Sequence, residues 1–260
     1  MHFHLPKPLH GWREFAGEVG IIVIGVLIAL GAEQVVEAMH WQEQVRAGRS
    51  ALRQDYADIV TNAREREAED ICIRRRLLYL RDLLNSHPDR LPAIGDIGSP
   101  PVRPWYPASW DSLVASNVSA HMTRDDLLKF GAIATQARLA EDTAQREIED
   151  WSIIYTMVGP ARPLAPGEAA QLRKAITDAA YQLNLIRLAA PQVSQKIAAT
   201  HLLSRVDLAQ VDQDVAATLH GPNARHICGP ILSMDASRVD APYDPAIEMH
   251  PVSSNEHENR

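Results

Sequence analysis

Hydrophobic positions along this chain form one continuous run near the N-terminus, followed by stretches in which apolar residues recur every three or four positions. The continuous run is Val19–Ala32, fourteen residues without a charge, nine of them Val, Ile or Leu. A helix of this length covers roughly 21 Å, against a membrane hydrocarbon core of about 30 Å. The run by itself is therefore compatible with a buried core helix, with the apolar part of a signal peptide or with a short membrane span.

The flanking residues favour the membrane span. Trp12 precedes the run and Trp41 follows it, 29 positions later. That spacing is roughly 43 Å of helix, close to the full bilayer thickness with its headgroup regions, and aromatic residues at both interfaces are typical anchors. Glu18 stands where a signal peptide carries positive charge. We predict a short tail over residues 1–18 and a transmembrane helix over residues 19–40, with Trp12 and Trp41 as its interfacial anchors.

The stretch from Gly11 to Glu37, GWREFAGEVGIIVIGVLIALGAEQVVE, resembles the start of a family of uncharacterised bacterial proteins that have one N-terminal membrane helix. The resemblance supports the anchor and implies no activity, cofactor or site residue. Basic residues lie on both sides of the span, Arg13 before it and Arg46 after it, so the positive-inside rule does not decide the orientation. A short leading tail and a long following domain predict an N-inside helix in the bacterial inner membrane, with the domain in the periplasm.

Beyond the span, the apolar spacing predicts a long amphipathic helix that continues from the anchor. One series of positions from Val45 to Leu84 alternates steps of three and four, and nine of its twelve members are apolar, as on the buried face of a helix. Its weak spot is polar, at Arg66 and Asp70. We expect the helix to end near Ser86, just before a His-Pro pair.

Prolines and a capping signal divide the next part of the chain. Residues 87–108 contain six prolines and predict an extended connection, followed by a short helix over residues 109–117. Thr123, with Asp126 three positions later, resembles a capping box. It predicts the start of a second long helix, which ends at a Gly-Pro pair.

A third long helix is predicted to begin at Pro166, a residue suited to the first helical turn, and Pro191 is expected to kink or break it. A last short helix covers residues 208–219. The apolar stripes of three long helices must be buried against one another. The predicted fold is therefore all-α, with one N-terminal transmembrane helix continuing into an antiparallel helical bundle over residues 41–228, and a loose C-terminal tail over residues 229–260.

Charge and cysteine content narrow the classes of partner. The formal net charge is −7, so we expect the lipid bilayer and proteins as partners and exclude nucleic acid, which needs a dense positive field. The two cysteines, Cys72 and Cys228, have no CxxC pair or Cys/His cluster beside them, which argues against structural zinc. They are free thiols if the domain faces a reducing compartment, and a single disulfide if the domain is exported.

Motifs for catalysis, cofactor binding or metal binding are missing from the sequence. Glu37 and His40 have the Glu-x-x-His spacing of di-iron bundles, but such a site needs a second copy of the motif on another helix. The other clustered histidines are predicted to be solvated: His2, His4, His10, His220 and His226. Because P-loop, GxSxG, HExxH and dinucleotide-binding motifs are absent too, we expect no enzyme activity and no cofactor.

Three further features bear on contacts. Trp105, Tyr106 and Trp110 concentrate aromatic rings in the proline-rich connection, where they form either a contact surface or a plug at an end of the bundle. The run Arg74–Arg76 is expected on the solvated face of the long helix. Two small-xxx-small pairs would allow membrane helices to self-associate: Ala16 with Gly20, and Gly25 with Ala29.

The sequence thus predicts a single-pass membrane protein whose bundle is an envelope interaction or scaffolding module. A ligand-binding sensor is the second hypothesis; it would signal through a partner's membrane helix, because the tail before the span is too short for an output domain. A cryptic enzyme is the third. A filled core with an exposed aromatic patch would favour the scaffold, whereas a bundle cavity lined by polar side chains would favour the sensor.

Overall fold

The computed structural model describes residues 11–220 and 227–231. Most of the two predicted tails, residues 1–10 and 232–260, lies outside the described residues. The described part confirms the all-α fold. Its elements in chain order are α1 (Trp12–Ser86), β1 (Arg90–Leu91), α2 (Ala108–Ala115), η1 (Val118–His121), α3 (Arg124–Ile154), η2 (Tyr155–Met157), β2 (Arg162–Pro163), α4 (Pro166–Ala198) and α5 (Arg205–His220).

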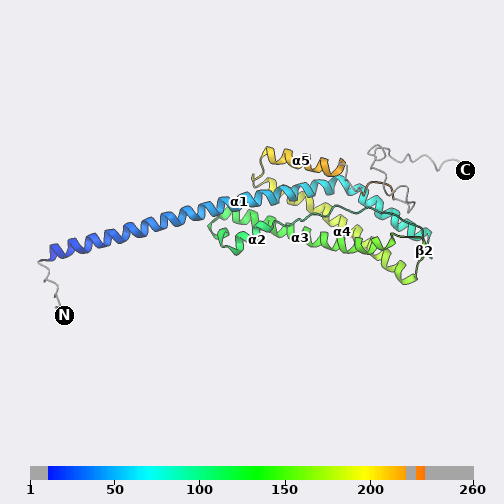
Figure 1. Ribbon diagram of the computed structural model, residues 1–260, viewed down its shortest axis with the longest axis horizontal. Helices are drawn as coiled ribbons and strands as arrows, with labels where there is room; N and C mark the ends of the chain where they lie inside the picture. The colour runs from blue at the N-terminus through cyan, green and yellow to red at the C-terminus, as the bar shows by residue number, and fades with distance from the viewer. Residues whose placement is uncertain (1–10, 221–226, 232–260) are drawn as a thin grey trace.

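Helix α1 carries both the apolar segment and the first helix of the bundle. It runs unbroken for 75 residues and contains no proline, and Figure 1 shows its N-terminal part extending far beyond the other helices. It ends at Ser86, where the N–H of His87 donates to the Leu83 carbonyl at 3.0 Å. Pro88 follows and cannot continue a helix. The predicted continuation of the apolar segment into the bundle is confirmed.

The starts of the other two long helices follow their local signals. Helix α3 begins after Thr123, whose hydroxyl oxygen accepts a hydrogen bond from the N–H of Asp126 at 3.1 Å, and α4 begins at Pro166. Of the kink or break expected at Pro191, the break is excluded, because this proline lies inside α4. Pro191 is on an exposed face, so the Arg187 carbonyl that it leaves without a helical donor can bind water instead.

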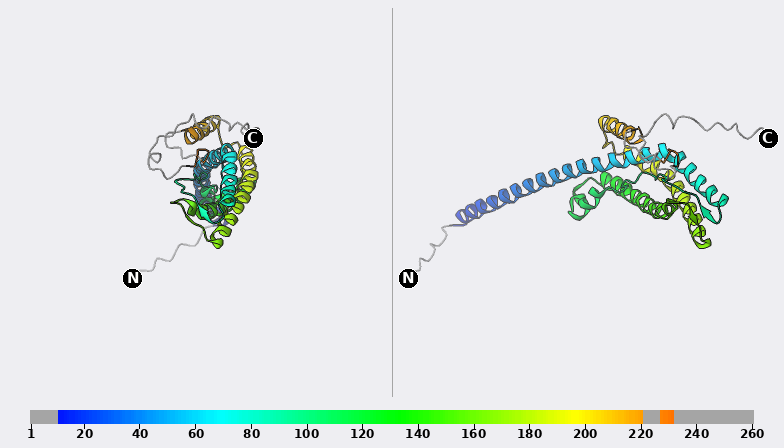
Figure 2. Two further views of the ribbon diagram at one scale, coloured as in Figure 1. Left: turned by 90° about the vertical axis from the view of Figure 1, so that its right-hand side faces the viewer. Right: turned by 45° about the vertical axis from the view of Figure 1, so that its right-hand side comes forward.

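Helices α1 and α4 make the main contacts of the bundle. Helix α3 packs on α4, α4 packs on the second half of α1, and α5 packs on α1; Figures 1 and 2 place α5 on the opposite side of α1 from α3. Strands β1 and β2 pair in antiparallel register, Leu91 opposite Arg162, at the end of the bundle farthest from the apolar segment. Neither was predicted, since a two-residue strand has no alternation to detect.

Buried apolar side chains form two separate clusters along the bundle. The proximal cluster, nearer the apolar segment, joins the α1 residues from Leu52 to Ala63 to the first half of α3 and the end of α4. The distal cluster joins the α1 residues from Ile73 to Leu84 to the end of α3 and the first half of α4. Between the two clusters the buried side chains are polar instead of apolar, and the candidate site lies there.

Candidate functional site

A layer of buried polar side chains separates the two clusters. Helix α1 contributes five of them, α3 two and α4 one, and none is more than 8% exposed: Thr61, Asn62, Glu65, Arg66, Glu69, Thr143, Glu147 and Gln182. Buried polar groups cost free energy unless they are paired. Of the predicted polar weak spot, Arg66 lies in this layer, whereas Asp70 is half-buried and pairs with Arg74 on the same helix. The sequence did not identify the partners of Arg66 and its neighbours on α3 and α4.

The centre of the layer is an ion pair between α1 and α3. Nη2 of Arg66 donates to Oε1 of Glu147 at 2.8 Å, and each side chain is only 4% exposed. Burial raises the pKa of Glu147, while the Arg66 guanidinium opposes that rise. Since arginine stays protonated in proteins, Glu147 is the counter-charge that makes its burial tolerable. The Nε of Arg66 has no hydrogen-bond partner in the part of the chain that the structure describes.

The proline-rich connection after β1 lies across this layer and is fixed to it. Arg103 makes two hydrogen bonds to the fully buried Glu65, Nε to Oε2 at 2.6 Å and Nη2 to Oε1 at 2.8 Å. Its carbonyl accepts from Nδ2 of Asn62 at 3.3 Å. The backbone N–H of Trp105 donates to Glu141 at 2.6 Å. The connection thus bridges α1 and α3.

Of the two alternatives predicted for Trp105, the exposed contact surface is wrong. Its side chain is 2% exposed and belongs to the proximal cluster. The expected position at an end of the bundle is also wrong, because its partner Glu141 lies midway along α3. The extended backbone imposed by neighbouring prolines lets the connection run along the bundle, and the large indole is buried there.

Tyr106 and Trp110 do not form one aromatic surface with Trp105. The Tyr106 hydroxyl donates to Asp111 at 2.7 Å, and the Arg138 guanidinium lies 4.5 Å from the centre of the Tyr106 ring. Trp110 packs edge-on against Phe130, with the ring centres 6.4 Å apart. Both rings are half-buried and contribute to the packing of α2 against α3.

A cavity of about 440 Å³ lies beside the polar layer, between the proline-rich connection and α3. Three aromatic residues line it, Trp105, Trp151 and Tyr155. Four charged residues also line it: Arg66, Arg103, Glu141 and Glu147. Its volume and its mixture of aromatic walls with a few polar groups are typical of small-molecule sites. Nothing in the sequence marked this cavity, because its walls come from segments distant along the chain.

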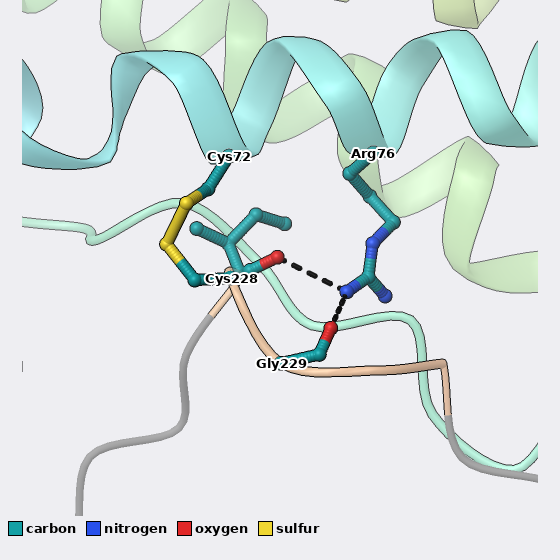
Figure 3. The surroundings of a disulfide bond; sticks show 5 residues. Cys72, Arg76, Cys228 and Gly229 are labelled. Carbon is teal, nitrogen blue, oxygen red and sulfur yellow. Dashed lines mark hydrogen bonds between the residues drawn. A yellow bond between two sulfur atoms is a disulfide. The ribbon is translucent and has the colours of Figure 1, made fainter. Parts of the chain in front are cut away.

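A disulfide fastens the end of the described chain to α1. Cys72 and Cys228 are bonded, with their Cα atoms 4.7 Å apart. One turn further along α1, Arg76 donates to the carbonyls of Ile97 at 2.5 Å and Ile227 at 3.0 Å, and to the carbonyl of Gly229. Figure 3 shows Cys72 and Arg76 facing this segment together. The structure therefore contains the disulfide expected of an exported domain.

The expected solvated face of the arginine run is wrong for Arg76, which is 6% exposed. Three backbone carbonyls replace the water that its guanidinium would otherwise bind. Burial lowers the pKa of Arg76, and Asp96 opposes this shift. Arg75, the preceding residue, is exposed as predicted.

The two tryptophans predicted as membrane anchors differ in their surroundings. Trp12 is 79% exposed. The ring of Trp41 stacks on His121 of η1, with centres 3.8 Å apart and planes 9° from parallel, and its N–H donates to Glu37 at 3.3 Å. Helix α1 is long and apolar enough to span a membrane, and none of its most apolar window is buried. Trp41 is thus covered in part by η1 where the apolar segment meets the bundle.

The residues considered for metal binding are dispersed. Glu37 and His40 are exposed on α1, and within residues 11–220 and 227–231 no group of three or more His, Cys, Asp or Glu could hold a metal ion. The prediction of a solvated His220 agrees with its exposure. The remaining predicted solvated histidines lie outside the described residues: His2, His4, His10 and His226.

Comparison with known proteins finds no matching family model, curated protein or solved structure.

Proposed function

We propose that this chain is a single-pass protein of the bacterial inner membrane whose periplasmic bundle binds a small ligand and signals through a partner's membrane helix. One observation carries the proposal. The helix that has an uncovered apolar segment also supplies Arg66 to the wall of the bundle cavity. A change in the cavity therefore acts directly on the helix that meets the lipid.

The membrane location is supported by the uncovered apolar segment. Ile24 and Ile28 are 58% and 67% exposed, and exposing a continuous apolar surface to water is unfavourable. Lipid would cover it on every side. The resemblance of Gly11–Glu37 to membrane-anchored bacterial proteins supports the inner membrane.

The periplasmic side is supported by the Cys72–Cys228 disulfide, since disulfides persist in the periplasm and are rare in the cytosol. A membrane-impermeant maleimide tests the side. The native cysteines are paired, so Glu67→Cys, at an exposed position of α1, supplies a single reactive thiol. Labelling in intact spheroplasts is expected. Labelling only after lysis would place the bundle in the cytosol.

The cavity favours ligand binding over scaffolding. An exposed aromatic patch would have supported a scaffold, but Trp105 is buried. The bundle instead has a cavity walled in part by the Arg66–Glu147 pair. We expect a protein partner to receive the signal within the membrane. A helix of that partner can approach α1 closely at Gly20 and Gly25, because nothing in the described part of the chain covers these two glycines.

Co-purification tests the ligand-binding function. Ala144 lines the cavity, so Ala144→Phe should fill it, whereas Ala68→Phe on the exposed face of α1 adds the same side chain elsewhere. Full-length protein is purified in nanodiscs, denatured, and analysed for released small molecules by mass spectrometry. A molecule released by the wild type and by Ala68→Phe, but not by Ala144→Phe, is expected. Identical profiles for all three would contradict ligand binding.

A further inference from the structure

We infer that the cavity takes a neutral, mainly aromatic molecule that carries a hydrogen-bond acceptor such as a carbonyl oxygen. This inference rests on the proposed ligand-binding function and adds the class of ligand. It follows from which polar groups in the cavity wall already have partners and which do not.

The two cations of the wall are both neutralised by carboxylates. Arg66 is paired with Glu147 at 2.8 Å. Arg103 makes two hydrogen bonds to Glu65, at 2.6 and 2.8 Å. An anionic ligand would have to compete with a carboxylate for one of these guanidinium groups. Breaking a buried pair leaves a charge without compensation, which is strongly unfavourable.

The remaining carboxylate of the wall is also occupied. One oxygen of Glu141 accepts from the backbone N–H of Trp105 at 2.6 Å, and the other accepts from Nε2 of Gln145 at 3.0 Å. A cationic ligand would therefore have to displace a backbone donor that holds the connection in place. The wall thus favours a ligand without net charge.

Two residues of the wall each hold a buried donor that has no partner in the described part of the chain: Nε of Arg66 and Nε1 of Trp151. Their side chains are 4% and 3% exposed, so water does not readily replace the missing acceptor. An unpaired buried donor is costly, and both groups can only donate. A ligand with an acceptor oxygen would satisfy them after a small movement of the side chains that it contacts.

The remaining side chains of the wall favour a ligand with a flat, apolar ring system. The rings of Trp105, Trp151 and Tyr155 line the cavity together with Ile148 and Pro101. Aromatic and proline side chains present broad apolar faces against which a ring can stack. The bound molecule would therefore place its ring system among these side chains and its acceptor toward Arg66 and Trp151.

Photolabelling of the full-length protein in nanodiscs tests the class of ligand. Benzophenone is a neutral aromatic ketone and cross-links where it binds; 4-benzoylbenzoate carries the same photoreactive group with a negative charge, and (4-benzoylbenzyl)trimethylammonium with a positive charge. We expect benzophenone to label peptides that contain residues 99–105 and 144–155, and the two charged probes to label them much less. Ala144→Phe should abolish this labelling.

The acceptor is tested by removing one donor. Trp151→Phe keeps an aromatic ring but lacks the N–H, and should reduce benzophenone labelling about three- to tenfold, the effect of one hydrogen bond. Trp110→Phe makes the same change outside the cavity and should leave labelling unchanged. Competition on the wild type is independent of how these variants fold. There, 2-acetylnaphthalene should displace benzophenone at a concentration several-fold lower than naphthalene, which has no acceptor.

The outcomes separate this inference from the proposed function. Stronger cavity labelling by a charged probe would overturn the neutral class while ligand binding stands. Equal competition by the two naphthalenes, with Trp151→Phe unchanged, would overturn the acceptor. Absence of cavity labelling by all three probes would overturn both the inference and the ligand-binding function.

Discussion

The two halves of α1 place similar apolar residues in opposite surroundings. In the first half, Ile24 and Ile28 are more than half exposed. In the second half, Leu52, Leu80 and Leu84 are fully buried. The difference lies in their distribution: the apolar residues of residues 19–32 cover every face of the helix, whereas those of the second half follow one stripe. A stripe can be buried by helices on one side, but a helix that is apolar on every face needs apolar surroundings on every side.

The largest expected effect comes from placing charged residues in the first half of α1. Ile24→Arg with Ile28→Arg should move the full-length chain out of the membrane fraction, because each arginine near the centre of a span costs about 2.5–3.5 kcal/mol. Carbonate extraction followed by immunoblotting measures this. Ile24→Leu with Ile28→Leu is the control and should stay in the membrane. Retention of the double-arginine chain after extraction would show that the first half is not a span.

Removing the disulfide should affect only the second half. Cys72→Ser with Cys228→Ser opens a loop between positions that are 156 residues apart, and loss of a native disulfide typically costs about 2–5 kcal/mol. The free energy of unfolding, measured by urea denaturation in nanodiscs, should fall by that amount, while carbonate extraction should give the wild-type result. An unchanged unfolding curve would mean that the Arg76 contacts alone hold the segment.

A core truncation in the second half should have a somewhat smaller effect. Leu80→Ala removes a fully buried side chain and should lower the free energy of unfolding by about 3 kcal/mol. Leu78→Ala, two positions earlier on the same helix, removes a side chain that is 43% exposed and should cost well under half as much. Equal losses for the two variants would contradict the placement of the stripe.

The smallest effect concerns Asp150 in the bundle. Burial, with a further contribution from Asp178, raises the pKa of Asp150 from 3.8 to about 6. A raised carboxyl pKa means that the folded state holds the proton more tightly, so stability is lost as the pH rises from about 4 to 6. Asp150→Asn should therefore be more stable than wild type at pH 7.5, by no more than about 1 kcal/mol because Asp150 is only half-buried and solvent screens its charge.

At pH 3.5 the stability difference between Asp150→Asn and wild type should disappear. Asp142→Asn on the exposed side of the same helix is the control and should change little at either pH. Thermal unfolding followed by circular dichroism measures both variants. A gain for Asp150→Asn that persists at pH 3.5 would have a cause other than this ionisation.

The helical architecture was accessible from the sequence because it depends on local signals. Apolar spacing, the Thr123 cap and Pro166 predicted the long helices and two of their starts. The effect of Pro191 was not accessible, because whether a proline breaks a helix depends on whether the freed carbonyl meets solvent. The β1–β2 pair was missed because each strand is only two residues long.

The candidate site was much less accessible, because its interactions join residues far apart in sequence. In the sequence, Arg66 is visible only as a polar residue in an otherwise apolar stripe, and its partner Glu147 lies 81 positions later. The buried Arg76 resembled its exposed neighbour Arg75 until three backbone carbonyls were placed around it. The aromatic run around Trp105 left a contact surface and a buried plug open, and the sequence could not decide between them, since burial of a loop aromatic depends on the path of the whole connection.

The central claim is that α1 passes from lipid into a water-exposed bundle without a break. Spin labels at Ile24→Cys, Ile28→Cys, Gln54→Cys and Glu67→Cys test it directly in nanodiscs, since the native cysteines are paired and do not react. The two labels in the first half should be relaxed more by dissolved oxygen, which concentrates in lipid, than by a water-soluble nickel chelate. The two labels in the second half should show the reverse. Strong relaxation by the nickel chelate at positions 24 and 28 would contradict the claim.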